Sequence, residues 1–173
     1  MRPTVLGERS ALVVSVSNRA AAGVYDDTTG PRIVSALREM GFGAVTATVV
    51  PDGDPVRDAL RDAVDAGVDL VLTTGGTGIT STDETPEMTR AVLTREVPGI
   101  AEAIRAYGVG KGVATAPLSR GVAGQAGATL IVNLPGSVGG VKDALAVLTP
   151  LIEHALEQVH GSDHARTEGT DEL

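Results

Sequence analysis

The chain has 173 residues, which is enough for one domain with a substantial core, and 42% of them are hydrophobic although only 2% are aromatic. One Phe and two Tyr cannot form a stacking platform for nucleic-acid bases, and a formal net charge of −8 disfavours nucleic acids and anionic membranes as partners. The absence of cysteine excludes disulfides, thiolate metal sites and cysteine nucleophiles.

The ends of the chain carry no targeting signal that the sequence makes recognisable. Residues 1–10 lack the apolar stretch of a signal peptide, and no apolar run approaches the ~18 residues of a membrane span. We therefore expect a cytoplasmic protein. We also expect a single folded domain over residues 1–160, followed by a polar, aperiodic and disordered tail over residues 161–173.

The first half of the chain alternates strand-like and helix-like segments. A near-continuous apolar run at 11–17 is typical of a strand that is buried on both faces. Gly30-Pro31 opens a helical segment, and Gly41 ends it. The same alternation continues with a strand at 44–50, a helix at 56–67 and a strand at 69–74.

The second half continues the alternation less regularly. Pro150 interrupts the apolar stripe of the last helix, which begins near Val138, and because proline removes one backbone hydrogen bond it predicts a kink or a break there. Before this helix, the pattern predicts two short helices and two strands: helices beginning at Pro86 and Pro98, and strands at 114–119 and 129–135.

Strand–helix alternation of this kind predicts an α/β fold, a three-layer α/β/α arrangement with a mostly parallel sheet and helices on both faces. Ligands of such sheets bind beyond the carboxyl ends of the strands. Three predicted strand ends carry polar or flexible residues, which we expect to form one site. The candidate binding residues are Ser17, Asn18, Thr73, Thr74, Gly75, Gly76, Thr77, Gly78, Asn133, Pro135, Gly136 and Ser137.

The segment TTGGTG after the third strand is the most informative of these strand ends. Glycines supply positive φ angles for a tight turn, but three glycines at the end of a buried strand favour a ligand-facing nest of N–H groups. The dinucleotide-binding pattern fails because position 81 is Ser81, and the P-loop pattern fails because Lys111 is followed by glycine. The loop is therefore predicted to bind an anion or another ligand without either nucleotide fingerprint.

Two aspartates follow predicted strand ends on the same side of the sheet. Asp83 is also suited to capping the helix that Pro86 begins, and Asp52 is also a typical turn residue. Two carboxylates with glycine N–H donors between them have the composition of a site in which Mg²⁺ and phosphates are held together. Both interpretations of the aspartates remain open on local sequence alone.

The three histidines do not support catalysis or metal binding. His154, His160 and His164 lack metal-ligand spacing with nearby acids, so they are expected on the solvated surface. No Ser-His-Asp arrangement is indicated.

Six segments, in order along the chain, together resemble a known family. They are VSVSNRA…GVYDDTTGPRI near the start, VVPDG at 49–53, LTTGGTGITSTDETPE at 72–87, VPGI at 97–100, APLSR at 116–120 and IVNLPGS at 131–137. They resemble the molybdopterin adenylyltransferases of molybdenum-cofactor biosynthesis: the Mog-type bacterial proteins, the plant equivalents and the G domain of gephyrin. The resemblance covers about residues 10–160.

The resemblance implies an activity and a set of residues. The terminal phosphate of molybdopterin attacks the α-phosphorus of ATP in the presence of Mg²⁺, which gives adenylylated molybdopterin and pyrophosphate. It implies that Asp52 and Asp83 are the functionally important aspartates, with Mg²⁺ as the metal, that Ser119 is the serine of the LSR motif, and that the glycine loop and Asn133 to Gly136 lie on ligand-binding loops. It further implies a homotrimer and handover of the product to a molybdate-insertion protein.

One residue departs from the family pattern. The family usually has aspartate after the first strand, where this chain has Asn18. A non-catalytic molybdopterin carrier or scaffold of the MoaB type is therefore the alternative, although the presence of Asp52 and Asp83 favours the enzyme.

Overall fold

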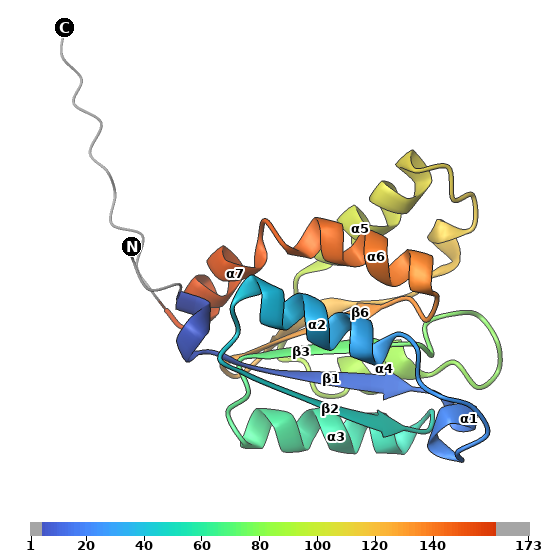
Figure 1. The fold of residues 1–173 in the computed structure, drawn as a ribbon, viewed down its shortest axis with the longest axis horizontal. Coiled ribbons are helices and arrows are strands. Elements are labelled where there is room, and N and C mark those ends of the chain that lie inside the picture. The colour runs from blue at the N-terminus through green and yellow to red at the C-terminus, as the bar shows by residue number, and fades with distance from the viewer. Residues whose placement is uncertain (1–4, 162–173) are drawn as a thin grey trace, which may run out of the picture.

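The computed structural model describes residues 5–161 and has three layers, with one sheet between two layers of helices (Figure 1). The sheet has six strands in the order β2-β1-β3-β6-β5-β4. The strands are β1 (Ser10–Val16), β2 (Ala44–Val50), β3 (Leu70–Thr74), β4 (Arg95–Glu96), β5 (Ala123–Ala126) and β6 (Thr129–Leu134).

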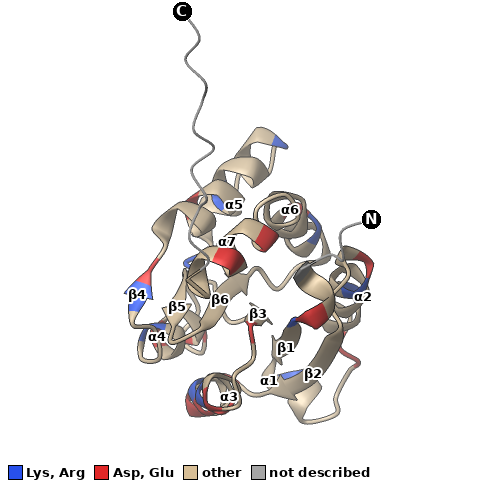
Figure 2. Ribbon diagram, turned by 90° about the vertical axis from the view of Figure 1, so that its left-hand side faces the viewer, with Lys and Arg blue, Asp and Glu red and all other residues tan. Residues whose placement is uncertain are grey.

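Helices cover both faces of this sheet (Figure 2). One face packs against α2 (Gly30–Met40), α5 (Pro98–Gly110), α6 (Val138–Leu148) and α7 (Ile152–Val159), and the other against α3 (Asp54–Asp65) and α4 (Thr85–Arg90). The remaining elements are short: η1 (Val5–Glu8), α1 (Asn18–Ala21) and η2 (Ala116–Leu118).

Strand direction confirms the predicted α/β fold with a mostly parallel sheet. The pairs β1–β2, β1–β3 and β3–β6 are parallel, whereas β5 runs antiparallel to both of its neighbours. A parallel sheet that is covered on both faces needs strands without polar alternation, and all five residues of β3 are buried.

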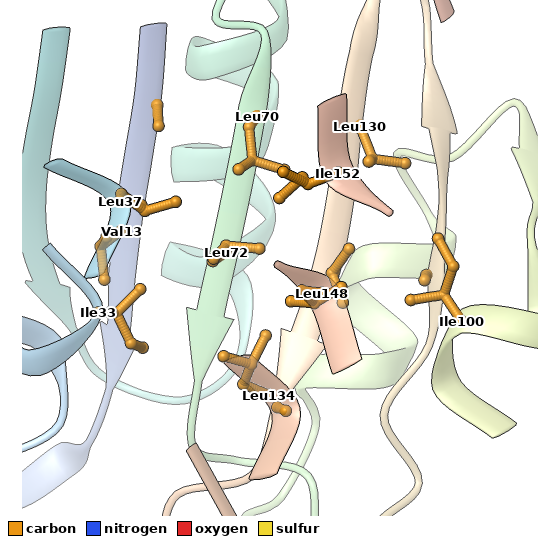
Figure 3. Close-up of a cluster of buried hydrophobic side chains, with 14 of the residues drawn as sticks. Val13, Ile33, Leu37, Leu70, Leu72, Ile100, Leu130, Leu134, Leu148 and Ile152 are labelled. Atoms are coloured by element: carbon orange, nitrogen blue, oxygen red, sulfur yellow. The ribbon is translucent and has the colours of Figure 1, made fainter. Parts of the chain in front are cut away.

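Two aliphatic cores hold the layers together. Side chains of β1, β3 and β6 pack against α2, α5, α6 and α7 in the larger core, where Leu72, Leu134 and Leu148 lie at the centre of the close-up in Figure 3. Val14, Val71 and other residues pack against α3 on the opposite face. Because aromatic residues are almost absent, the packing depends on branched aliphatic side chains, as the composition predicts.

Some expectations from the sequence need correction. The segment 114–119 is not a strand: it contains the 3₁₀ turn η2. The helix that Pro86 begins ends already at Arg90. By contrast, the break predicted at Pro150 is confirmed, because the last helix is divided there into α6 and α7. The antiparallel pair of β4 and β5 and the short helix α1 were not anticipated, because none of them has an apolar pattern of its own.

His160 lies on the surface, as expected, but its ring also contacts an aspartate. Its Nε2 lies 2.8 Å from Oδ1 of Asp69, at the amino-terminal edge of the sheet. The Asp69 carboxylate also accepts hydrogen bonds from Arg9 (3.0 Å) and from the N–H (2.7 Å) and hydroxyl (3.1 Å) of Ser10. Burial alone would raise the pKa of Asp69, but these hydrogen bonds outweigh it and hold the pKa below its usual value.

Within residues 5–161, no helix is long and apolar enough to cross a membrane. The predicted tail, apart from Gly161, lies outside the described residues.

Candidate functional site

The carboxyl ends of β1, β3 and β6 meet at one edge of the sheet, as the sequence predicts. In the parallel register Thr74 pairs with Ser15 on one side and with Leu134 on the other. Beyond these paired residues, the segments that follow β3 and β6 are joined directly. The Gly75 N–H donates to the Leu134 carbonyl (3.3 Å), and the Thr74 hydroxyl donates to the Pro135 carbonyl (2.8 Å). The site is therefore built on buried strands rather than on free loops.

Glycine is required at the two positions where the β3–α4 loop turns. Gly75 and Gly76 have φ angles of 95° and 65°, which side-chain-bearing residues rarely adopt. A Cβ at Gly75 would collide with the Val16 carbonyl, and a Cβ at Gly76 would collide with the Thr85 hydroxyl and lie 2.7 Å from Oδ1 of Asp52. Because these two glycines have no side chains, the loop can pack directly against Asp52 and Thr85.

Asp52 has an unpaired buried oxygen at this edge. It lies between β2 and α3, where its N–H donates to Oδ1 of Asn18 (3.0 Å). Its own Oδ1 and Thr85 Oγ1 are the buried side-chain oxygens of the described residues that lack a hydrogen-bond partner. Burial, and then the charges of Asp83 and Glu84, raise the pKa of Asp52. An unsatisfied buried carboxylate beside other acids is typical of a ligand site.

Asp83 holds a turn in the β3–α4 loop and does not cap the helix that follows. Its Oδ2 accepts from the N–H (3.0 Å) and the hydroxyl (2.8 Å) of Thr80. The N-cap of α4 is Glu84, which makes no capping hydrogen bond with its side chain. Oδ1 of Asp83 accepts no hydrogen bond from the described residues, so one oxygen of this half-buried carboxylate remains available to a ligand.

Arg120 clamps the same loop from the far side. Its backbone N–H donates to Thr77 O (2.8 Å), its Nε to Gly78 O (2.7 Å) and its Nη2 to Asp83 O (2.7 Å). Its Nη1 pairs with the Glu87 carboxylate, which lowers the pKa of Glu87. A planar guanidinium with donors in fixed directions thus ties two carbonyls of the loop to Glu87 of α4. Sequence reasoning noted this guanidinium without assigning it a role.

A small cavity of about 220 Å³ opens where β1, β3 and β6 end. The Asp27 carboxylate supports it, because Oδ2 accepts from the Ser15 hydroxyl (2.5 Å) and Oδ1 accepts from the first N–H of α2, at Gly30 (3.0 Å). Six hydroxyl-bearing residues line the cavity: Ser15, Ser17, Tyr25, Thr28, Thr29 and Thr74. Hydroxyls and backbone at this density suit a polar ligand.

A larger cavity of about 370 Å³ lies between α5 and the start of α6. Its lining combines apolar side chains with the basic residues Arg105, Lys111 and Lys142, and it includes the predicted Ser119, Pro135 and Ser137. The hydroxyl of Ser137 accepts from the Gly140 N–H (3.0 Å) and so caps α6, while Ser119 donates to the Thr77 hydroxyl (3.3 Å). Apolar walls with a basic rim suit a flat ligand with an anionic end.

Asn133 is placed differently from the other predicted binding residues. Its side chain is buried, with Oδ1 accepting from Val122 N–H (3.1 Å) and Nδ2 donating to the hydroxyls of Thr73 (3.0 Å) and Thr89 (2.9 Å). The amide therefore joins β6, β3 and α4 behind the site. The structure gives Asn133 a bracing role in place of the ligand contact that was expected, because its donors are already used by protein partners.

Several residues of the site escaped the sequence interpretation. Asp27 lies within the DDTTG stretch that carried the resemblance, but its carboxylate was given no role. Lys111 and Arg105 were considered only in rejecting the P-loop pattern, and Lys142 was not considered. A usable signal existed for Lys142, since it lies near the start of the helix that follows the predicted strand end.

Comparison with known proteins places this site in a family. The model described as "Probable molybdopterin binding domain" matches residues 12–154. The chain is 38% identical over 160 residues to the molybdenum cofactor biosynthesis bifunctional protein of Synechococcus elongatus, which covers 92% of this chain and 50% of that protein. The chain thus spans about half the length of the first curated relatives that it matches.

Shorter relatives match over most of their length. The chain is 36% identical over 154 residues to the molybdopterin adenylyltransferase of Helicobacter pylori, with 87% of each protein covered. The solved structure of the molybdopterin biosynthesis Mog protein from Mycobacterium ulcerans superposes with a TM-score of 0.84 at 56% identity, covering 87% of this chain and 99% of that one. The chain therefore belongs to the family of probable molybdopterin-binding domains of molybdenum-cofactor biosynthesis.

Proposed function

We propose that this protein transfers the adenylyl group of ATP to the terminal phosphate of molybdopterin. A phosphate oxygen of molybdopterin attacks the α-phosphorus of ATP, one P–O bond forms, and the bond from the α-phosphorus to the bridging oxygen breaks. Pyrophosphate leaves with that oxygen and its electron pair, so the products are adenylyl-molybdopterin and pyrophosphate. The name of the Helicobacter pylori relative supports this reaction class.

The observation that carries the proposal is the unpaired, buried Oδ1 of Asp52 beside Gly76. A carboxylate that is left unsatisfied next to bare backbone, with Asp83 close enough for their charges to couple, is costly unless a cationic or hydrogen-bonding ligand occupies the site. Phosphoryl and nucleotidyl transfer require a protein to position the substrates and to neutralise charge, with little covalent chemistry. The residues at this edge are suited to that task.

Mg²⁺ is the metal that these residues fit. Within the described chain, no group of three His, Cys, Asp or Glu side chains is placed to hold a metal ion by itself. Mg²⁺ commonly uses one or two carboxylates together with substrate phosphates, so Asp52 and Asp83 form a sufficient donor set. We assign the ion to these two residues, where it would neutralise charge on the reacting phosphates.

The two cavities suit the two substrates. The larger cavity, with apolar walls and a rim of Lys111 and Lys142, matches a pterin that carries a phosphate. The hydroxyl-lined cavity that includes Ser17 and Thr74 matches the sugar and base of a nucleotide. Gly136 lies against Gly75, where an added Cβ would be 3.1 Å from the Gly75 Cα, so bare glycine backbone at this point leaves room for phosphates between the two cavities.

We extend the proposal to assembly and partners. A homotrimer is proposed through the projecting end of α5, where Tyr107, Val109, Val113 and Leu118 are exposed large apolar residues. The product would pass to a molybdate-insertion protein, and the protein would work in the cytoplasm.

The test is to incubate the protein with molybdopterin, ATP and Mg²⁺ and to measure pyrophosphate release and adenylylated pterin. Both products are expected in equal amounts, and omission of either substrate should abolish both. Binding of molybdopterin without pyrophosphate release would contradict the enzyme and identify the non-catalytic carrier. Asn18→Asp is the informative companion variant, because Asn18 contacts the Asp52 backbone and replaces the aspartate usual in the family.

A further inference from the structure

Two buried oxygen atoms without hydrogen-bond partners lie beside the same glycine. Among residues 5–161, the buried side-chain oxygens that lack a partner are Oδ1 of Asp52 and Oγ1 of Thr85. A Cβ added at Gly76 would collide with the Thr85 hydroxyl and would lie 2.7 Å from Oδ1 of Asp52. Both oxygens therefore face one point of the backbone, although they lie far apart in the sequence. The proposed reaction gives Asp52 a role and gives Thr85 none.

Thr85 is held in place through its backbone. It is the first residue of α4 and is fully buried. Its N–H donates to the Gly76 carbonyl (3.1 Å), and its carbonyl accepts from the hydroxyl of Thr89 (2.8 Å), which in turn accepts from Nδ2 of Asn133 (2.9 Å). Strand β6 and the β3–α4 loop thus fix Thr85 from two sides. Within the described part of the chain, its hydroxyl is the polar group of this residue that stays unpaired.

Asp52 has the complementary requirement. Its N–H donates to Oδ1 of Asn18 (3.0 Å), a bond that fixes the backbone and does not involve the carboxylate. A carboxylate accepts hydrogen bonds only, whereas a hydroxyl has one proton to donate. A buried acceptor and a buried donor that face one point can satisfy each other, and leaving both unsatisfied is costly.

We propose that Thr85 is a positioning residue for Asp52: its hydroxyl donates to Oδ1 in the loaded site and so turns Oδ2 toward Mg²⁺ and the substrate phosphates. This inference rests on the Mg²⁺ site of the proposed function. Because both oxygens already face Gly76, rotation about side-chain bonds brings them together without a change in the backbone.

Asp83 shows the same arrangement in completed form. Carboxylates that bind a metal ion are themselves held by hydrogen bonds, which fix their orientation. Oδ2 of Asp83 accepts from the N–H (3.0 Å) and the hydroxyl (2.8 Å) of Thr80, and its Oδ1 is the oxygen left for a ligand. Oδ1 of Asp52 has no such support, and the Thr85 hydroxyl is the unpaired buried donor beside it. Each aspartate of the proposed metal site is thus matched with one threonine.

A buried threonine can instead serve as a packing residue, whose methyl group matters and whose hydroxyl is incidental. Removal of the hydroxyl then relieves one unsatisfied group and has no other effect. The two roles differ in metal binding, because a residue that orients a metal ligand changes the affinity for the ion and a packing residue does not.

Thr85→Val tests the role, since it removes the hydroxyl and keeps the shape of the side chain. Mn²⁺ is the probe for the metal site, and its binding to the protein alone is measured by water-proton relaxation. We expect the dissociation constant of Mn²⁺ to rise about 10-fold, the lower end of the usual cost of losing a group that orients a metal ligand. The free Mg²⁺ concentration for half-maximal pyrophosphate release should rise as well, while the KM of molybdopterin stays unchanged.

Thr85→Ser and Thr129→Val are the controls. Serine keeps the hydroxyl, so Mn²⁺ binding should stay within about twofold of the parent. Thr129 is also buried, and its hydroxyl donates to the Val68 carbonyl (2.7 Å) at the amino-terminal end of β6. Thr129→Val should lower the melting temperature and leave Mn²⁺ binding unchanged. Without metal, Thr85→Val should melt at the temperature of the parent or above it, because it removes an unsatisfied hydroxyl.

Equal Mn²⁺ affinity in the parent and in Thr85→Val would overturn the inference. Weakening by Thr85→Ser or Thr129→Val as large as that by Thr85→Val would also overturn it, because the effect would then come from packing. A parent that does not bind Mn²⁺ would remove the metal that Asp52 is proposed to face. If Mn²⁺ affinities follow the expected order while the parent releases no pyrophosphate, Thr85 keeps its role and only the proposed reaction fails.

Discussion

Two aspartates, the buried Asp69 and the half-buried Asp52, lie at opposite ends of the strands of the same sheet and differ in their hydrogen-bond partners and in the direction of their pKa shifts. Asp69, at the amino-terminal edge, has hydrogen bonds from Arg9 and Ser10 and a 2.8 Å contact with Nε2 of His160, and its pKa is lowered. Asp52, at the carboxyl edge, has a buried oxygen without a partner, and its pKa is raised. Protein groups donate to both oxygens of the Asp69 carboxylate, whereas Asp52 keeps one oxygen unpaired and is repelled by Asp83 and Glu84.

This difference separates a residue that stabilises the fold from a residue that serves the proposed activity. A carboxylate whose partners are all provided by the protein ties elements together, here the first residues of β1 and β3 to the end of α7. A carboxylate that lacks partners costs free energy in the empty protein and recovers it when a ligand binds. Asp69 is therefore expected to govern stability and Asp52 to govern activity.

The largest expected effect is on the activity of Asp52→Asn. Loss of one well-placed charge that stabilises the transition state typically lowers kcat ~10²–10³-fold. The melting temperature should stay equal or rise, because asparagine removes the repulsion from Asp83 and Glu84. Pyrophosphate release at saturating ATP and Mg²⁺, together with thermal melting, measures both. Activity within about threefold of the parent with a lower melting temperature would reverse the comparison.

A smaller loss is expected from releasing the loop that Arg120 holds. Arg120→Met removes its side-chain bonds to Gly78, Asp83 and Glu87, and we expect kcat to fall about 10-fold to 100-fold, with faster hydrogen exchange in residues 76–84. Arg90→Met is the matched control, since that arginine makes an exposed pair with Glu96. Equal effects of the two variants would show that Arg120 contributes only surface charge.

Asp69→Asn should affect stability alone. Loss of charged partners in a buried network is expected to lower the free energy of unfolding by about 1–3 kcal/mol, while kcat stays near that of the parent. Asp54→Asn is the control, because the Asp54–Arg57 pair has the same 3.0 Å separation but Asp54 is 70% exposed, so its loss should be within about 0.5 kcal/mol. Equal losses in urea unfolding would mean that the Asp69 network adds nothing beyond a surface pair.

The smallest effect is a difference in pH dependence between the two variants. The pKa of Asp69 is lowered from 3.8, so its contribution is present above about pH 4 and is lost as the pH falls through the folded-state pKa. The pKa of Asp52 is raised from 3.8, so the cost of its charge starts to fall as the pH drops through the raised pKa and is gone below about pH 4. As the pH is lowered, the difference in free energy of unfolding between the parent and Asp52→Asn should vanish at a higher pH than the difference between the parent and Asp69→Asn. Closure in the opposite order would contradict both assignments.

Parts of the site were predictable because they depend on backbone and periodicity. Buried apolar runs predicted β1, β2, β3 and β6, and parallel strands necessarily bring their carboxyl ends to one edge. The requirement for glycine at Gly75 and Gly76 was visible for the same reason, since only glycine adopts these φ angles without strain. The antiparallel pair of β4 and β5 was missed because a two-residue strand such as β4 has no period to detect.

Side-chain roles were less predictable, because they depend on partners that are distant in the sequence. Asn133 was read as a ligand contact, but Thr73 and Thr89 take up its amide, which local sequence does not reveal. Arg120 reaches a loop some 40 residues earlier in the chain, and His160, directly after α7, reaches Asp69, directly before β3. The ligand-binding roles of the predicted residues stay predictions.

By itself the sequence determined the strand–helix alternation, the aliphatic core, the glycine turn after β3 and the two acids beyond the strand ends. Each of these follows from local rules of periodicity, composition and φ angle. Only the tertiary structure decided which polar groups are satisfied. It paired Asp69, left an oxygen of Asp52 unpaired, and placed the unpaired hydroxyl of Thr85 next to that oxygen at Gly76. Hydrogen-bond satisfaction depends on which groups meet in space, and contacts between residues far apart in the chain are set by packing of the whole fold.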